Sequence, residues 1–350
     1  MAGAKKSSNG IALVLGATGS FGGALALELL ARGYTVRALV RDPAKAAARL
    51  GKRPDLDLVR GNALDPIAVS QAARGASVVV HGVNYPYDQW APNMHVATEN
   101  AIAAAEEARA LIVFPGNVYG LGAPGRAPLT EAAPNAPCSG KGALRVELEE
   151  HLRWSAQAGH SRVLILRAGD YFGPTVRNGL VDPIFANALR GRPMQALGRL
   201  DVPHQWAYVP DLARAAADLI ARAKTLKPFE VVNFAGHIAL PARAFFAEVA
   251  TAAGRPKLAV RRVPWWLLGL VGRFKPVVRE LMEMRYLFDE AVVLDDPRFR
   301  QLLPSFKATP LDAAIRETLD SYRGDVVTPR FGRAASAAAA RSRGHRSGRV

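Results

Sequence analysis

The sequence predicts an α/β fold in which a doubly wound parallel sheet is followed by a smaller, mostly helical C-terminal lobe. Short apolar runs alternate with helix-like segments across about 160 residues. The first run leads directly into glycines spaced three apart, and mainly helical periodicity follows after about residue 236. Alternating strands and helices require crossover connections, which cover a parallel sheet on both faces.

The apolar runs are nearly continuous, as is typical of strands that are buried on both faces. In the first helix-like segment, Leu25, Leu29 and Leu30 share one face, and Gly33 stands where a left-handed cap belongs. The expected strands are residues 11–15, 34–40, 56–59, 77–83, 111–114, 163–166 and 230–234. The expected helices include residues 21–32, 66–74, 142–158, 211–224, 240–253 and 277–287.

This pattern divides the chain into four parts. Residues 1–9 are an N-terminal extension, residues 10–236 form the α/β domain, residues 237–324 form a C-terminal substrate lobe, and residues 325–350 form a basic tail. Residues from about 172 to 206 are broken by prolines into short pieces, so we assign them to the substrate lobe. The tail lacks apolar periodicity and is expected to be disordered.

The net charge of +16 arises from 46 Lys plus Arg against 30 Asp plus Glu in 350 residues. Six of the arginines lie from Arg330 to Val350, where there is no acid, so the first 329 residues carry 40 − 30 = +10. The remaining basic residues are spread among acids and are not interleaved with aromatic residues. We therefore expect no nucleic-acid partner.

Cysteine content and hydropathy exclude further classes. Cys138 is the single cysteine and cannot form an intrachain disulfide, and no zinc-ligand spacing is recognisable, so we expect no metal and a reducing, cytoplasmic location. The longest apolar run, residues 263–272, falls short of the roughly 18 residues that span a bilayer. We expect no signal peptide and no membrane partner.

The segment Gly16-Ala17-Thr18-Gly19-Ser20-Phe21-Gly22 predicts a dinucleotide site of the Rossmann type. The first glycine allows a tight strand-to-helix turn, the second lets the backbone approach a pyrophosphate, and the third permits close helix packing. The N–H groups at the start of the helix are free to bind the anion. A purely structural glycine turn is the alternative.

The end of the second strand, Val40-Arg41-Asp42, bears on the choice of cofactor. A carboxylate there usually binds the ribose 2′-hydroxyl of NAD, whereas the 2′-phosphate of NADP needs a cation. Arg41 is a cation of this kind, Arg37 is a less well placed one, and we favour NADP. In the alternative, Arg41 is only an exposed residue, Asp42 contacts the ribose, and the cofactor is NAD.

Several short motifs, taken in order, resemble the extended and atypical short-chain dehydrogenases/reductases of the NAD-dependent epimerase/dehydratase family. The resemblance covers residues from about 10 to 324 and implies that Asn62, Ala63, Gly82 and Val83 contact the cofactor. The motifs are Gly16-xx-Gly19-xx-Gly22, Gly61-Asn62-Ala63-Leu64-Asp65, Val80-His81-Gly82-Val83, Asn117-Val118-Tyr119-Gly120, the span from Leu166-Arg167 to Gly173-Pro174, the stretch from Trp206 to Ala213, and Val232-Asn233.

The usual catalytic residues of that family, a Ser or Thr and a Tyr-x-x-x-Lys, are absent, because none of the eight tyrosines has a lysine four residues later. If Glu149 is aligned with the family's glutamate after Tyr-x-x-x-Lys, Lys141 takes the tyrosine position and Arg145 the lysine position, while Pro115 replaces the Ser or Thr. Lys141 is a candidate proton donor or ribose ligand. A solvated Lys141 at a helix start is the equally weighted alternative.

Other candidates lie at the same edge of the sheet. Asp170 follows the sixth strand and is our second candidate for substrate or nicotinamide contact. Tyr85 and Tyr87 follow the fourth strand, and Cys138 and Ser139 precede Lys141, but each is more often a packing or loop residue. We interpret Trp265-Trp266 in the second lobe as core or a lid over an apolar pocket, with a membrane-surface wedge as the lesser alternative.

Together these features predict an NAD(P)-dependent oxidoreductase or epimerase/dehydratase-like enzyme in which other residues replace the family's usual catalytic triad of Ser or Thr, Tyr and Lys. Its substrate would be a small carbonyl compound, an alcohol or a sugar derivative, with Lys141, Arg145 and Asp170 as the candidate catalytic residues. A non-catalytic NADP(H)-binding sensor or scaffold is the alternative. The oligomeric state is left open, with a homodimer among the options.

Overall fold

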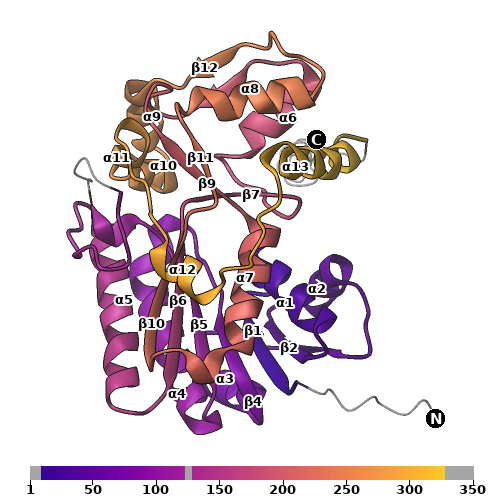
Figure 1. Ribbon diagram of the computed structural model, residues 1–350, viewed down its shortest axis with the longest axis vertical. Helices are drawn as coiled ribbons and strands as arrows, with labels where there is room; N and C mark the ends of the chain where they lie inside the picture. Colours follow the sequence, from indigo (N-terminus) through magenta and orange to yellow (C-terminus); the bar gives the residue numbers. More distant parts are fainter. Residues whose placement is uncertain (1–8, 123–127, 328–350) are drawn as a thin grey trace, which may run out of the picture.

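A parallel sheet of seven strands forms the centre of the protein in the computed structural model, which describes residues 9–122 and 128–327 (Figure 1). Its strand order, β10-β6-β5-β4-β1-β2-β3, reverses direction between β1 and β4, as in doubly wound folds. The strands are β1 (Ile11–Leu15), β2 (Thr35–Val40), β3 (Leu56–Arg60), β4 (Ala76–His81), β5 (Leu111–Gly116), β6 (Arg162–Ala168) and β10 (Phe229–Phe234). The predicted fold class is confirmed.

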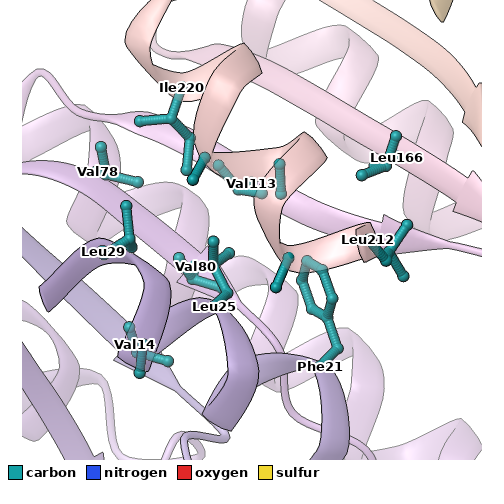
Figure 2. Close-up of a cluster of buried hydrophobic side chains, with 14 of the residues drawn as sticks. Val14, Phe21, Leu25, Leu29, Val78, Val80, Val113, Leu166, Leu212 and Ile220 are labelled. Carbon is teal, nitrogen blue, oxygen red and sulfur yellow. The ribbon is translucent and has the colours of Figure 1, made fainter. Parts of the chain in front are cut away.

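Helices cover both faces of this sheet, and a buried apolar layer fills the space on each side. On one face Leu25 and Leu29 pack with Val14 and Val80 of the strands, and all four side chains are fully buried (Figure 2). Burying a leucine of this kind contributes about 1.5–3 kcal/mol. One face carries α1 (Ser20–Ala31), α2 (Pro43–Leu50) and α7 (Val209–Ala221), and the other carries α3 (Pro66–Ala73), α4 (Trp90–Ala108) and α5 (Gly140–Gln157).

A second lobe lies above the carboxyl edge of the sheet in Figure 1. It contains more strand than its predominantly helical sequence pattern predicts, because the proline-broken stretch contributes strands to two small sheets. These sheets comprise β7 (Asp170–Phe172), β9 (His204–Tyr208) and β11 (His237–Ala239), and β8 (Met194–Ala196) with β12 (Val260–Arg262). Its helices are α6 (Asp182–Arg190), α8 (Arg243–Ala252), α9 (Trp265–Gly272), α10 (Pro276–Met282), α11 (Tyr286–Asp289) and α13 (Leu311–Val327).

Three boundaries differ from the sequence-based expectation. The helix expected over residues 277–287 is divided into α10 and α11. The segment containing α12 (Pro297–Leu302) returns to the first domain, where Phe299 and Leu303 are buried against the sheet helices. Helix α13 continues three residues into the expected tail, because its apolar face packs into the lobe through Ile315, Leu319 and Tyr322. Residues 1–8 and 328–350 lie outside the described part of the chain.

The carboxyl ends of the parallel strands meet the second lobe, and the sequence motifs lie at this junction. Gly16, Arg41, Gly61-Asn62-Ala63, Gly82 and the Pro115–Tyr119 stretch follow β1 to β5 or close them, each at the same edge. Open α/β sheets bind ligands in the crevice at this edge. No helix in the described ranges combines the length and apolar character needed to cross a membrane.

Candidate functional site

A cavity of about 890 Å³ lies between the carboxyl edge of the sheet and the second lobe. One half is lined by the glycine turn and the ends of β2, β3 and β4, and we call it the cofactor half. The other half is lined by the loop after β5, by helix α5, by β7 and by residues 277–292, and we call it the substrate half. A cavity of this volume is large enough to hold a dinucleotide together with a small substrate.

The glycine turn is packed so tightly that side chains would not fit. Gly16 has φ +80°, and a Cβ there would lie 2.3 Å from the carbonyl oxygen of Gly82. A Cβ on Gly22 would lie 2.5 Å from the carbonyl oxygen of Gly16. The Gly19 N–H donates to that same oxygen at 2.8 Å, and Gly19 is the N-cap of α1. The residues therefore fit a pyrophosphate bound at the N-terminus of α1.

Two hydrogen bonds fix the loop after β3, which is predicted to contact the cofactor. Asn62 accepts from the Leu64 N–H at 3.2 Å, and Asn100 donates to the Ala63 carbonyl at 2.9 Å; Asn62 and Ala63 both line the cavity. All the predicted cofactor-binding residues except Gly22 and Lys141 line the cavity: Gly16, Thr18, Gly19, Ser20, Phe21, Arg41, Asn62, Ala63, Gly82 and Val83.

Three charged residues near the end of β2 have different roles. The exposed Arg41 lines the cavity. The Asp42 carboxylate accepts from the Lys45 N–H at 3.0 Å and caps α2, and Asp42 is not among the residues that line the cavity. Arg37 donates to the carbonyls of Ala72 and Arg74 at 2.6 and 3.0 Å, at the end of α3. Of the two predicted arginines, only Arg41 lines the cavity.

Lys141 lies beside the cavity without lining it. Its side chain is buried, and Nζ pairs with Glu280 at 2.6 Å and with Glu283 at 2.5 Å, both on or next to α10. The alternative that Lys141 is solvated is therefore wrong, because this pairing buries it. The two carboxylates bind the ammonium group and connect α5 to the second lobe.

Arg145 does line the cavity, one helical turn along α5 from Lys141. Its guanidinium donates to the Pro115 carbonyl at 3.2 Å and lies 5.0 Å from the ring centroids of Trp90 and Phe114. Burial lowers the pKa of Arg145, although an arginine remains protonated in proteins. The site thus places a fixed positive charge where the family resemblance implies a lysine.

Glu149 and Arg167 form a buried ion pair next to this position. The Arg167 guanidinium donates two hydrogen bonds to the Glu149 carboxylate, and both side chains are almost completely buried. The pair joins α5 to β6, which sets the position of Arg145 relative to the sheet. Glu149 was the residue that aligned this helix with the family pattern.

Asp170 pairs with a residue that sequence analysis missed, His204. The His204 Nε2 lies 2.9 Å from Asp170 Oδ2, and both residues line the substrate half. The imidazole ring also stacks on Phe288, with centroids 5.9 Å apart. The two residues are 34 positions apart on β7 and β9, two strands that pair in parallel. No local pattern could have identified this pair.

Two tyrosines form a second polar group in the substrate half. The hydroxyl oxygens of Tyr87 and Tyr119 are 3.0 Å apart, and both residues line the cavity. Burial raises the pKa of Tyr87, and it raises the pKa of Tyr119 well above its ordinary value. Burial likewise raises the pKa of Tyr171 to about 12. These phenols are therefore neutral hydrogen-bond donors near pH 7 and not bases.

His81, the last residue of β4, is fully buried and is not among the residues that line the cavity. Its Nε2 lies 2.8 Å from the Thr98 hydroxyl, and burial, with Arg145 nearby, lowers the pKa of His81 to about 3.

Cys138 is exposed, and the Ser139 hydroxyl accepts from the Gly142 N–H at 3.0 Å and caps α5. Trp265 is core, as predicted, whereas its neighbour Trp266 is 72% exposed.

The fold and the cavity define a Rossmann protein of the NAD-binding class, and the sequence comparison specifies the family. The model of the NAD dependent epimerase/dehydratase family matches residues 12–235. The chain belongs to this family.

Solved structures with the same fold cover nearly the whole chain. The enzyme WbmH of Bordetella bronchiseptica, in complex with NAD⁺, has a TM-score of 0.70 and 18% identity, over 90% of this chain and 98% of its own. The dTDP-glucose 4,6-dehydratase DesIV of Streptomyces venezuelae, with NAD and TYD bound, has a TM-score of 0.72 and 19% identity, over 90% and 97%. At this identity the likeness concerns the fold.

Two curated relatives are more similar in sequence but are matched only in part. The uncharacterized protein y4nG of Sinorhizobium fredii is 28% identical over 63% of this chain and 55% of its own length. A 3-diazoavenalumate denitrifying reductase of a Streptomyces species is 35% identical over 46% of this chain and 56% of its own. The chain spans about half the length of these relatives.

Proposed function

We propose that this protein is an NAD(P)H-dependent oxidoreductase that reduces an electrophilic carbon, such as a carbonyl carbon, in a substrate with an apolar body. The observation that carries the proposal is the Asp170–His204 pair, which lies in the same cavity as the glycine turn. The cofactor, when bound, supplies or accepts a hydride at its nicotinamide ring. The residues of the chain then have to place the substrate and supply a proton.

His204 is the proposed proton donor. In a carbonyl reduction the carbon receives the hydride and the oxygen receives a proton, which yields an alcohol. Asp170 fixes the imidazole through Nε2 and leaves Nδ1 for the substrate oxygen, an arrangement that general acids commonly use. In this proposal the neutral hydroxyls of Tyr87 and Tyr119, which line the same cavity, hydrogen-bond this oxygen, and the Arg145 charge stabilises its developing negative charge. Asp170 is a positioning residue. In this proposal His204, and not Lys141 as the sequence suggested, donates the proton.

The apolar wall of the substrate half supports the substrate class. A nucleotide diphosphate would need several cations at this wall, whereas an aromatic or aliphatic group needs apolar contact. The alternative of a sugar derivative is favoured only by the names of structural neighbours such as DesIV. The wall comprises Leu180, Leu197, Val277, Val278, Leu281, Met284, Leu287, Phe288 and Val292.

NADP is the proposed cofactor. Arg41 lies at the cavity with its guanidinium exposed, and Asp42 is occupied by the cap of α2, so the cation is the better placed of the two for a 2′-phosphate. The name of the Streptomyces relative, a reductase, agrees with hydride transfer to substrate.

The proposal is tested with NADPH, NADH and a panel of aldehydes and ketones of increasing apolar size. We expect loss of the reduced-nicotinamide absorbance with at least one apolar carbonyl compound. His204→Gln should lower kcat by about 10²–10⁴-fold without changing cofactor affinity, because only the proton donor is lost. Asp170→Asn should lower kcat less and shift the pH profile of kcat, since it changes the orientation and charge environment of the imidazole.

His160 offers a matched control, because its Nδ1 also pairs with a carboxylate, Glu106 at 2.5 Å, but on the exposed surface. His160→Gln should leave kcat unchanged. Retained turnover in His204→Gln would remove the proposed proton donor. Cofactor binding without turnover of any substrate would favour the second candidate, a cofactor-binding sensor, for which the observation is the replacement of the usual triad by Pro115, Lys141 and Arg145.

A further inference from the structure

The second lobe exposes an apolar surface on and beside α9. We call the six residues of this surface the α9 patch. Phe274 is 82% exposed and Trp266 is 72% exposed, although large aromatic residues usually contribute buried area. Contiguous exposed apolar surface of this kind commonly marks an interaction site. The patch consists of Trp266, Leu267, Leu270, Val271, Phe274 and Val277.

The patch forms one continuous face. With 3.6 residues per turn, positions 266, 267, 270, 271 and 274 fall within an arc of about 140° when the helical direction is continued to residue 274. The opposite side of α9 is used for packing: Trp265 is buried, and Gly272 lies against the backbone of Arg279 in α10, where a Cβ would come within 3.1 Å. The exposed residues are therefore the side of α9 that the lobe does not use.

Basic residues flank the patch in the sequence. Residues 261–279 contain five basic residues and no acidic one. Trp and Phe next to Lys and Arg are typical of segments that bind at the interface of an anionic membrane. The basic residues are Arg261, Arg262, Arg273, Lys275 and Arg279, and all are exposed.

A second copy of the chain is a less suitable partner for this surface. In a two-fold dimer the same patch lies on both subunits, so the basic residues around one patch would face those around the other. Of the two neighbouring acids, Glu283 pairs with Lys141, and Glu280 pairs with Lys141 and, at 3.8 Å, with Arg279. Arg279 is therefore partly neutralised, whereas Arg273 and Lys275, on either side of Phe274, keep their charge for a partner. An anionic lipid surface supplies both the apolar interior and the negative charge that the patch lacks.

We propose that the α9 patch docks the protein onto the surface of anionic lipid bilayers, with Trp266 and Phe274 inserted at the level of the headgroups. This inference replaces the expectation from sequence that the protein has no membrane partner. Val277, which belongs to the patch, and its neighbour Val278 in α10 also line the substrate half of the cavity. Docking would therefore place that wall of the cavity beside the bilayer, where an apolar substrate is concentrated. This last step alone rests on the proposed function.

The test is co-sedimentation of the full chain with vesicles of phosphatidylcholine, with or without phosphatidylglycerol. We expect binding to the anionic vesicles that weakens as salt is raised, and little binding to the neutral ones. Arg273→Glu with Lys275→Glu should weaken binding at least tenfold, and Trp266→Ser with Phe274→Ser by a similar factor. Lys224→Glu and Trp154→Ser, at exposed positions outside the patch, are the matched controls.

Insertion is measured separately from charge attraction by quenching of tryptophan fluorescence with brominated lipid. Quenching should occur in the unmodified chain and in Trp154→Leu, and it should be largely lost in Trp266→Leu, which keeps the patch apolar. This readout separates the patch from the basic segment 330–350, which contains none of the five tryptophans. Cofactor titration and thermal melting of each variant establish that it is folded.

Absence of binding to anionic vesicles would overturn the proposal. Equal binding by the patch variants and the controls would also overturn it, because attraction would then arise elsewhere. A concentration-dependent dimer that is lost in Trp266→Ser with Phe274→Ser, without vesicle binding, would identify a second copy as the partner instead. None of these results depends on turnover, so failure of the docking proposal is distinguishable from failure of the proposed reaction.

Discussion

The two halves of the cavity are built in different ways. The cofactor half is made of short contiguous segments, such as Gly16 to Phe21 and Gly61 to Ala63, each at the end of a parallel strand. The substrate half joins side chains that are far apart in sequence, such as Tyr87 with Tyr119 and Asp170 with His204. The first half depends on backbone that is free of side chains, and the second depends on side chains that tertiary packing brings together.

This difference suggests how the two halves can vary. A glycine turn that fits a pyrophosphate leaves little freedom, since added Cβ atoms at Gly16 or Gly22 would meet backbone. Side chains that line or border the substrate half can change without disturbing the glycine turn. Replacement of the family's usual catalytic groups by Pro115, Lys141 and Arg145 is therefore compatible with a preserved cofactor site.

The largest effect is expected for Gly19→Val, which tests the cofactor half alone. Gly19 has φ −79°, and a Cβ would lie 3.1 Å from the Gly16 carbonyl oxygen, so the fold needs to adjust by only a few tenths of an ångström. The side chain would nevertheless occupy the place of the pyrophosphate. We expect NADPH affinity to fall at least about 100-fold, or about 2.7 kcal/mol, by calorimetric titration.

Gly324→Val is the control for this variant, since no heavy atom lies within 4 Å of the added Cβ position and Gly324 is not among the residues that line the cavity. It should leave NADPH affinity unchanged. An unchanged affinity in Gly19→Val would contradict the assignment of the glycine turn.

A smaller effect is expected for Lys141→Met, at the junction between the two halves. Removal of the ammonium group leaves Glu283 without its cation and Glu280 with only the more distant Arg279, and we expect a loss of about 1–3 kcal/mol in the free energy of unfolding. Because α10 carries part of the substrate wall, KM should rise while kcat stays within a few-fold. Urea denaturation and steady-state kinetics measure these two quantities.

Two results would change this interpretation of Lys141. Loss of turnover with unchanged stability and unchanged NADPH affinity would restore Lys141 as the proton donor and remove His204 from that role. A triple variant, Lys141→Met with Glu280→Gln and Glu283→Gln, should recover most of the lost stability, since it removes the unpaired charges as well.

The same contrast explains what the sequence could and could not predict. All seven strands of the main sheet and the cofactor motif were predicted, because buried parallel strands and glycine turns leave local patterns. The Asp170–His204 pair was not predicted, since a parallel pairing of β7 and β9 creates it and short strands with intervening prolines carry no clear period. The alignment through Glu149 assigned Arg145 to the family's lysine position, and the structure shows that Arg145 lines the cavity; its catalytic role stays a prediction.

The smallest effect is expected for Arg41→Ala, which concerns specificity within the cofactor half. Loss of the cation should weaken NADP binding about tenfold, or about 1.4 kcal/mol, and leave the affinity for NAD nearly unchanged, because only NADP carries the 2′-phosphate. Arg37→Ala is the matched control: its guanidinium binds the carbonyls of Ala72 and Arg74, so its loss should lower stability without changing the NADP-to-NAD ratio. Equal losses for both cofactors in Arg41→Ala would contradict 2′-phosphate binding. In that case Asp42→Asn would show whether the Asp42 carboxylate leaves the N-cap of α2 to bind a ribose. If it does, the Asp42→Asn variant should bind NAD more weakly while its stability stays unchanged.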